Sequence, residues 1–300
     1  MQLGINTDFL QETGKPEKYL RLIADAGFTH INWCHQWNTD FIYSRSEITR
    51  IGRWLKEYGL QLQDIHASAG VEKLWFSGDE YARQAGVELI TNRIRMFAQL
   101  GGTGALTLHG PSRMRLFKWD NSNVPQEMLM ARRSMDELMP VLEKYQAAIA
   151  IENMRNDFFE CIEEFTAAYP EKYLGITYDS GHGNYGYGRG TSCLERNKSR
   201  LKALHLNDND GTLDRHQTPF YGTVDWEKLA AIIAGSAYSG PLSFELSMRY
   251  MPHFNSGIKE QPEEKIREFL TDAREKCAKV AEFYRKFKAV PGSASGNCAE

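Results

Sequence analysis

The sequence places a potential metal ligand at the end of each of six consecutive apolar segments. These residues are His66, His109, Glu152, Asp179, His205 and Glu245. A single histidine in such a place is more often a hydrogen-bonded structural residue than a ligand. Glu152 and Glu245 are harder to explain in that way, because they interrupt the almost wholly apolar runs AIAIEN and PLSFEL. A buried carboxylate without a partner is costly or loses its charge, so we predict a metal site where these side chains meet.

The types of the predicted ligands limit the choice of metal. Imidazole nitrogens and carboxylate oxygens without a thiolate suit Zn, Mn, Co or Fe better than Ca, and they tolerate Mg. We therefore predict a divalent metal cofactor, namely Mn, Zn, Co or Mg. His182 follows Asp179 by three residues in DSGH, and Asp214 and His216 lie in DRH after His205. We expect these three residues to be additional metal ligands or contacts to the substrate.

Eight predicted strands would position the ligands. Short apolar segments rich in β-branched residues alternate with longer stretches of helical period, at residues 2–6, 28–33, 61–67, 104–110, 147–153, 173–179, 201–207 and 241–246. This repeat predicts a single (β/α)8 TIM barrel, in which the carboxyl ends of the strands share one rim. A doubly wound open sheet is the main competitor, but neither GxGxxG nor GxxxxGK[ST] occurs.

Helix signals support this organisation. Pro16 predicts the first helical residue of the first helix, and Ser46 and Asp79 are expected to cap the N-termini of later helices. An amphipathic stretch after Gln261 predicts a closing helix. We expect one barrel domain over residues 1–288 and a flexible, disordered C-terminal tail over residues 289–300.

The composition is typical of a globular protein with a sizeable core. The 300 residues are 42% hydrophobic and 25% charged, and the formal charge of -3 gives no global positive field for nucleic acid. The five cysteines are scattered, which argues against a disulfide framework. No segment approaches the length of a membrane span, so the expected location is the cytoplasm. The oligomeric state stays open, a homo-oligomer included.

Five short motifs together resemble those of the xylose isomerase-like TIM barrels. They are EN (152–153), DSGH (179–182), HLND (205–208), DRH (214–216) and FEL (244–246). That superfamily includes sugar isomerases and epimerases, and also the endonuclease IV type of DNA-repair enzyme. The resemblance extends from the first predicted strand to about Glu245, and the motifs are fairly specific as a set.

The resemblance implies two different ligand sets. In the sugar epimerases one divalent cation is held by residues that match Glu152, Asp179, His205 and Glu245. Endonuclease IV relatives use three zinc ions and also recruit residues that match His66, His109, His182, Asp214 and His216. Every one of these residue types is present. The inventory of ligands alone therefore does not separate the two branches.

Loop composition favours a small sugar substrate over nucleic acid. The predicted rim loop 207–214 is acidic, which would repel DNA, and aromatic residues near the strand ends suit the apolar faces of a sugar. The resemblance to the epimerases implies that His182 contacts the substrate, and we expect Trp33 and Arg113 to contact it as well. The expected reaction is isomerisation or epimerisation of a sugar or sugar phosphate through a metal-stabilised enediolate, with Glu152 and Glu245 transferring protons. The alternative is an endonuclease IV-like, zinc-dependent phosphodiesterase.

Overall fold

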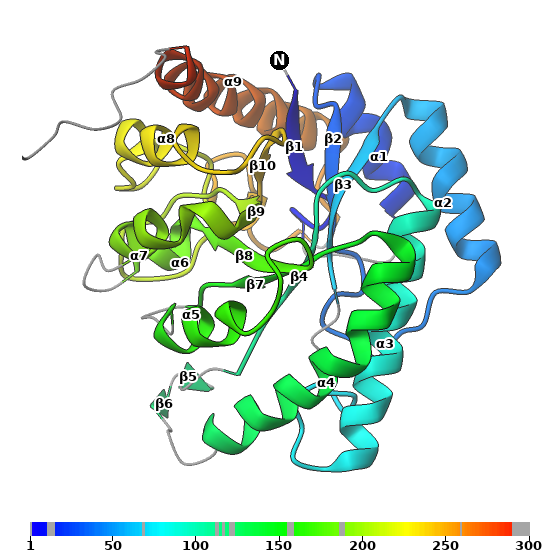
Figure 1. Cartoon of the computed structure of the whole chain (residues 1–300). Helices are drawn as coiled ribbons and strands as arrows, with labels where there is room; N and C mark the ends of the chain where they lie inside the picture. Colours follow the sequence, from blue (N-terminus) through cyan, green and yellow to red (C-terminus); the bar gives the residue numbers. More distant parts are fainter. Residues whose placement is uncertain are drawn as a thin grey trace, which may run out of the picture.

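A parallel barrel dominates the computed structural model, which describes residues 2–10, 16–67, 70–111, 114–115, 118–119, 124–154, 159–185, 190–258 and 260–289. Within these ranges, eight parallel strands run in the order β10-β1-β2-β3-β4-β7-β8-β9 (Figure 1). Their bounds are β1 (Leu3–Asn6), β2 (His30–Trp33), β3 (Gln61–His66), β4 (Leu106–Leu108), β7 (Ile149–Glu152), β8 (Leu174–Asp179), β9 (Leu201–His205) and β10 (Leu242–Phe244). The predicted barrel and all eight of its strands are confirmed, although each strand is somewhat shorter than predicted.

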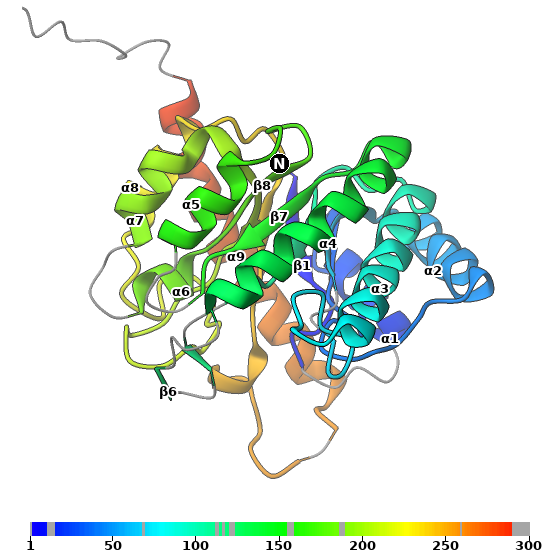
Figure 2. The same cartoon turned by 60° about the horizontal axis from the view of Figure 1, so that its bottom comes forward.

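Helices cover the outside of this barrel, and Figure 2 shows α3 and α4 side by side against it. The α-helices are α1 (Pro16–Asp25), α2 (Arg45–Tyr58), α3 (Glu80–Gln99), α4 (Val124–Tyr145), α5 (Phe159–Ala167), α6 (Ser180–Asn184), α7 (Gly190–Asn197), α8 (Trp226–Ala234) and α9 (Glu263–Lys288). Two 3-10 turns, η1 (Lys198–Arg200) and η2 (Met248–Tyr250), and a hairpin of β5 (Met114–Arg115) and β6 (Lys118–Trp119) complete the described elements.

Capping residues define where several helices begin. The α1 helix begins at Pro16, and Asp79 caps α3 by accepting a hydrogen bond from the Ala82 amide, as predicted. The prediction for α2 was wrong by two residues, because Ser44 and not Ser46 is its N-cap. Ser44 accepts from the Glu47 amide while the Glu47 carboxylate accepts from the Ser44 amide. This reciprocal pair satisfies two backbone donors that a cap at Ser46 would leave unpaired.

Small side chains fill the barrel directly beneath the rim. Side chains two residues apart on a strand face the same way, so Ala150 lies under Glu152 and Ala203 lies under His205. With Ala105 these alanines form a buried cluster. Thr107 and Thr177 hydrogen-bond to each other at 2.8 Å nearby. The barrel interior is therefore narrow and closed below the predicted ligands.

The barrel closes least tightly between β9 and β10. Within the described residues these strands are joined by an isolated bridge between Leu206 and Phe244 rather than by a ladder. Its backbone hydrogen bonds run from the Leu206 amide to Ser243 O at 3.0 Å and from the Glu245 amide to Leu206 O at 3.1 Å. This seam lies beside two of the predicted ligands, His205 and Glu245.

The C-terminal part of the chain packs α9 against α8. The α9 helix runs from Glu263 to Lys288, so the closing helix predicted after Gln261 is confirmed. Of the predicted tail over 289–300, residues 290–300 lie outside the described residues. Among the helices that are described, none combines the length and the apolar character needed to cross a membrane.

Candidate active site

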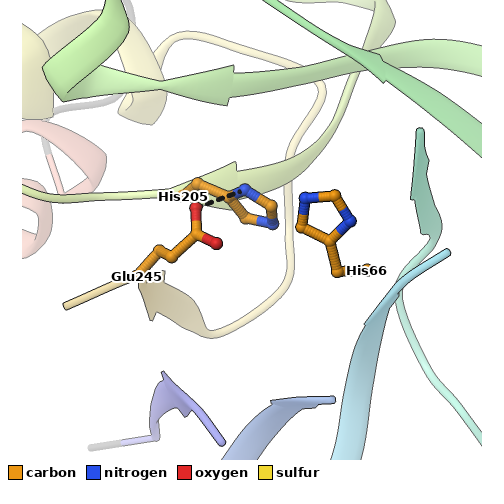
Figure 3. Close-up of side chains that lie close together, drawn as sticks. All are labelled: His66, His205 and Glu245. Atoms are coloured by element: carbon orange, nitrogen blue, oxygen red, sulfur yellow. Dashed lines mark ion pairs between the residues drawn. The ribbon is translucent and has the colours of Figure 1, made fainter. Parts of the chain in front are cut away.

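The centre of the site is His205, the last residue of β9, which lies between two glutamates. Its Nδ1 atom is 2.8 Å from Glu245 Oε2 and 3.1 Å from Glu152 Oε1, and Figure 3 shows the ion pair with Glu245 beside the ring of His66. Glu152 ends β7 and Glu245 directly follows β10. All three side chains are almost completely buried, so the charges face one another and not solvent.

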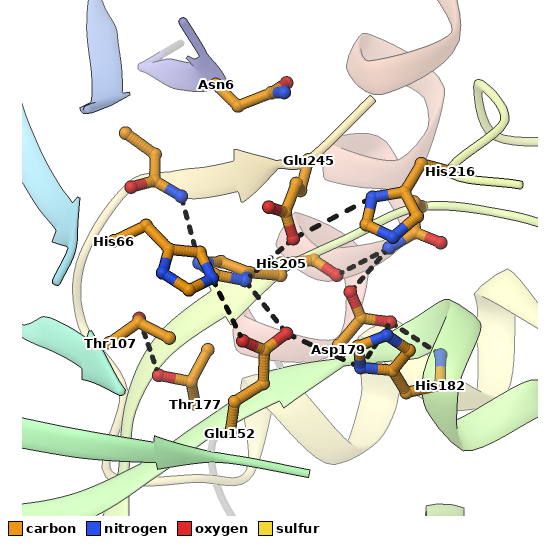
Figure 4. A network of polar contacts seen from close by, with 12 residues as sticks. Asn6, His66, Thr107, Glu152, Thr177, Asp179, His182, His205, His216 and Glu245 are labelled. Atoms are coloured by element: carbon orange, nitrogen blue, oxygen red, sulfur yellow. Dashed lines mark hydrogen bonds and ion pairs between the residues drawn. The ribbon is translucent and has the colours of Figure 1, made fainter. Parts of the chain in front are cut away.

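A fourth side chain, Asp179 at the end of β8, completes a group of possible ligands. One ligand atom from each of Glu152, Asp179, His205 and Glu245 lies within 4.8 Å of the others (Figure 4). These are the four residues predicted to hold a single cation. Asp179 is completely buried and receives a hydrogen bond from Asn207 Nδ2 on Oδ2 at 2.7 Å. The chain thus gathers three carboxylates and one imidazole in a volume that excludes water.

Neighbouring charges shift the pKa values of the residues in this group. Burial alone would lower the pKa of His205, but the carboxylates of Glu245 and Glu152 outweigh it and raise that pKa well above its usual value. Burial would raise the pKa of Glu245, yet the neighbouring His205 holds it down at about 2. Burial raises the pKa of Asp179 to about 6. A proton on His205 therefore balances part of the negative charge, and a cation can replace it.

The buried amide of Asn32 provides a test of whether the group fits a metal. Its Nδ2 lies 2.9 Å from His205 Nε2, and its Oδ1, also buried, has no hydrogen-bond partner. Rotating the amide by 180° would let Oδ1 accept a hydrogen bond from Nε2–H. That hydrogen bond leaves the Nδ1 lone pair of His205 facing the two glutamates, as a metal-binding imidazole requires. The donor set therefore fits a divalent cation of the kind that binds nitrogen and oxygen.

The five other predicted ligand-type residues lie on either side of this group. On one side, His109 Nε2 is 3.2 Å and His66 Nε2 is 3.6 Å from Glu152 Oε2. On the other side, Asp214 bridges two histidines, with Oδ2 at 3.2 Å from His182 Nε2 and Oδ1 at 3.0 Å from His216 Nε2. In the described part of the chain, His66–His109–Glu152 and Asp179–His182–His216 are two of three further groups of converging ligand atoms, and the third, His66–His205–Glu245, shares two residues with the central group.

Comparison with known proteins agrees with this arrangement of strands. A family model described as xylose isomerase-like TIM barrel matches residues 20–273. The chain belongs to the xylose isomerase-like TIM barrel family. An uncharacterized protein of Sinorhizobium fredii, y4fM, is 33% identical over 256 residues, which cover 77% of this chain and 81% of that protein.

Solved structures of this family share the fold across nearly the whole chain. A D-tagatose 3-epimerase-like protein matches with a TM-score of 0.73 at 20% identity, covering 95% of this chain and 99% of that one. A D-psicose 3-epimerase from Clostridium cellulolyticum, solved with D-tagatose, gives 0.68 at 15% identity over 96% and 99%. A 3-keto-D-glucoside 4-epimerase from E. coli gives 0.68 at 19% identity over 92% and 99%. At these identities the likeness shows a common fold.

One predicted substrate contact, Trp33, does not face the site of this xylose isomerase-like barrel. Trp33 is only 1% exposed and donates a hydrogen bond from Nε1 to Tyr43 Oη at 2.9 Å, so its prediction as a substrate contact was wrong. The preceding residue, Asn32, faces His205 instead, and adjacent residues of a strand point to opposite faces. Trp37 lies against His66 in its place. Arg113 lies outside the described residues.

Three asparagines that the prediction did not assign to the site support its carboxylates. Asn153 makes two hydrogen bonds with the backbone of Asp179. Its Oδ1 accepts from the Asp179 amide at 2.6 Å, and its Nδ2 donates to the Asp179 carbonyl at 2.9 Å. Asn6 donates to Leu246 O and accepts from the Leu246 amide, next to Glu245. Asn207 donates from Nδ2 to Asp179 Oδ2 at 2.7 Å. The motifs EN and HLND contained two of them, and these asparagines fix the orientation of the ligands.

Asp208 organises the loop that carries Asp214 and His216. It is completely buried, and its carboxylate accepts hydrogen bonds at 2.9–3.0 Å from the amides of Asn209, Phe220 and Val224 and from Trp226 Nε1. Asp208→Ala is expected to lower the free energy of unfolding by about 3 kcal/mol, because several buried donors lose their acceptor. Urea denaturation measures this loss.

The matched control is Asp210→Ala in the same loop. Asp210 is exposed and pairs with Arg215 at 2.8 Å, and exposed pairs contribute about 0.5 kcal/mol. If Asp208→Ala and Asp210→Ala unfold at the same urea concentration, Asp208 does not organise the loop.

Proposed function

We propose that this protein is a divalent-metal-dependent isomerase or epimerase of sugars or sugar phosphates. The observation that carries the proposal is the convergence of Glu152 and Glu245 on one atom, His205 Nδ1, at 3.1 and 2.8 Å (Figure 4). Two carboxylates that converge in this way can both reach one small ligand bound beside them. The epimerases among the solved structures support a sugar as the substrate.

The carboxylates supply the proton chemistry. A cation held by Glu152, Asp179, His205 and Glu245 would polarise the carbonyl and stabilise the enediolate charge. Glu152 takes the proton from the carbon beside the carbonyl, and Glu245 gives a proton from the other face, which inverts that carbon. Return of a proton to the neighbouring carbon on the same face gives isomerisation. Nearby histidines hold the pKa of Glu152 and Glu245 low in spite of burial, so Glu152 is ready to accept a proton, and Glu245 has to take up a proton from solvent before it can give one to the carbon.

His182 is placed to hold a substrate oxygen. Its ring is 6% exposed, its Nδ1 is 2.8 Å from Asn153 O and its Nε2 is 3.2 Å from Asp214 Oδ2. Burial would lower its pKa, but the charges of Asp179 and Asp214 raise it well above the usual value. Both N–H groups of the imidazolium are used in these contacts, so it holds a substrate oxygen only when Nε2–H turns from Asp214 Oδ2 to the substrate.

Proton exchange tests the proposed function. Purified protein with Mn²⁺ or Co²⁺ is incubated in D₂O with D-tagatose, D-psicose and L-ribulose, and with their phosphates. We expect deuterium to enter the carbon beside the carbonyl and an epimer or isomer to accumulate, both followed by NMR. Absence of exchange with every ketose would overturn the proposal.

Two of the further ligand groups favour a second candidate, a phosphodiesterase of the endonuclease IV type. His66–His109–Glu152 and Asp179–His182–His216 offer places for more than one ion, and multinuclear sites stabilise both oxygens of a phosphoryl displacement. Metal analysis and incision of DNA that contains an abasic site separate the candidates. Three zinc ions per chain together with incision would favour the phosphodiesterase.

A further inference from the structure

The segment between β2 and α2 brings an aromatic ring to the site. The centroid of the Trp37 ring lies 4.5 Å from that of His66, tilted by 35°, and 5.3 Å from that of His109, edge to face. Trp37 also lines a cavity of about 460 Å³ together with Asp8 and Glu245. The ring therefore forms one wall of the space in front of the carboxylates.

The backbone that presents Trp37 has an unfavourable conformation. Gln36 has a φ of 63°, in the left-handed region that a residue other than glycine rarely adopts. This turn directs the Trp37 amide to Cys34 O at 3.1 Å. Such conformations persist only where surrounding contacts hold them, and they gather at functional sites.

Two neighbouring residues of α3, Asn92 and Arg93, provide those contacts. Asn92 accepts a hydrogen bond from the Tyr43 amide at 2.9 Å and donates to Tyr43 O at 2.8 Å. Arg93 Nη2 donates to Phe41 O at 2.9 Å and to Gln36 O at 3.5 Å. The pair thus forms hydrogen bonds with the backbone of three residues of the β2–α2 segment.

The environment of Arg93 is unusual for a buried charge. It is 1% exposed, its guanidinium lies 4.5 Å from the centroid of the Tyr43 ring, and no carboxylate forms an ion pair with it among the described residues. Burial lowers its pKa to about 10. A buried cation that binds backbone carbonyls of a rim segment is a costly way to stabilise a fold, and it suits the precise placement of that segment.

We propose that Trp37 is a specificity-determining residue, the apolar wall against which the carbon skeleton of a sugar packs. Asn92 and Arg93 are positioning residues that act through the β2–α2 segment. The proposal rests on the proposed function for the nature of the substrate. It explains why the strained turn at Gln36 is stabilised from α3, which lies outside the barrel.

Variants of the wall are tested first, with D-tagatose as the probe. Trp37→Ala is expected to raise KM about tenfold with a much smaller change in kcat, because an aromatic contact is lost while the carboxylates remain. Trp37→Phe keeps an aromatic face and is expected to stay within about threefold of the wild-type KM.

The positioning pair is tested by Arg93→Met, with Arg93→Lys as the conservative variant and Arg95→Met as the control. Arg95 is exposed on the same helix. Arg93→Met is expected to raise KM in the same direction as Trp37→Ala, Arg93→Lys to restore part of it, and Arg95→Met to change nothing. If Arg93→Met does not fold, Asn92→Asp takes its place, because it keeps the acceptor for the Tyr43 amide and loses the donor to Tyr43 O.

A readout without turnover completes the test. In protein labelled with 5-fluorotryptophan, the ¹⁹F resonance of Trp37 is the one missing from Trp37→Phe. We expect it to shift when D-tagatose is added, and to shift or broaden in Arg93→Met but not in Arg95→Met. An unmoved resonance in Arg93→Met overturns the positioning role.

The same measurements separate two kinds of failure. If the wild type turns over D-tagatose and Trp37→Ala has an unchanged KM, the sugar does not pack against Trp37, and the proposed function stands. If the wild type neither binds nor exchanges any ketose, the proposed function and the sugar wall both fall, while the spectra still decide the role of Arg93.

Discussion

Glu152→Gln is expected to lower kcat about 10³-fold, and Glu245→Gln is expected to have an effect of similar size. An amide cannot accept the proton of a substrate C–H bond, so each substitution removes one of the two proton-transferring groups. The fold should persist, because glutamine has nearly the same volume and its amide oxygen can still accept from His205 Nδ1. Deuterium exchange into a ketose and steady-state kinetics measure the loss, and circular dichroism reports the fold.

A matched substitution tests whether the effect belongs to the site. Glu143 is exposed on α4, which lies on the outside of the barrel (Figure 1), and Glu143→Gln is expected to leave kcat unchanged. A variant of Glu152 or Glu245 that keeps more than a tenth of the wild-type kcat would refute the assigned proton-transferring pair. If deuterium exchange is lost in one variant and survives in the other, the residue replaced in the variant without exchange is the one that removes the proton.

Removal of divalent ions is expected to abolish turnover and to lower Tm by about 5 °C or more. An ion present at 100 times its Kd stabilises the folded chain by about 2.7 kcal/mol, and in a chain of this size each kcal/mol shifts Tm by about 2–4 °C. Three buried carboxylates surround His205, so the chain without its ion retains strong repulsion. Chelation, differential scanning fluorimetry and readdition of Mn²⁺, Co²⁺ or Zn²⁺ test this prediction.

The affinity for the ion is expected to increase with pH. In the metal-free chain Glu245 and Glu152 raise the pKa of His205 well above its usual value, against the effect of burial, so the ion must displace a proton. Below that pKa, each unit by which the pH falls weakens binding of the ion about tenfold. Burial raises the pKa of Asp179 to about 6, which adds to the loss in mild acid. Calorimetric titrations at pH 6 and pH 8 should give tighter binding at pH 8, and equal affinities would disprove the competition.

The strands and their terminal ligands were predictable because barrel geometry converts chain order into position. Each strand ends at the same rim, so a ligand-type residue at the end of an apolar segment reaches the site without knowledge of any loop. Glu152 and Asp179 are the last residues of β7 and β8, and Glu245 directly follows β10. Their convergence was therefore open to prediction from spacing and residue type.

The sequence could not predict which face of a strand a side chain points to, or where a loop places its side chains. All four residues of β2 are buried, as is usual for parallel strands covered on both faces, so the polar–apolar alternation of HINW does not show that the polar residue Asn32 points inward and Trp33 outward. The place of Trp37 depends on contacts from α3, which lies some fifty residues later in the chain. The N-cap of α2 was within reach, because Ser44 and Glu47 have the spacing of a capping box.

The loose seam between β9 and β10 would give a bound ion a second role. His205 belongs to one side of this seam and Glu245 to the other, and their 2.8 Å ion pair spans the place where the strands share only an isolated bridge. A cation coordinated by both residues would link β9 to β10 and hold the barrel closed at this seam. The amides of Leu206 and Glu245 would then exchange with solvent at a rate set by ion release, and the barrel would open locally each time its cofactor leaves.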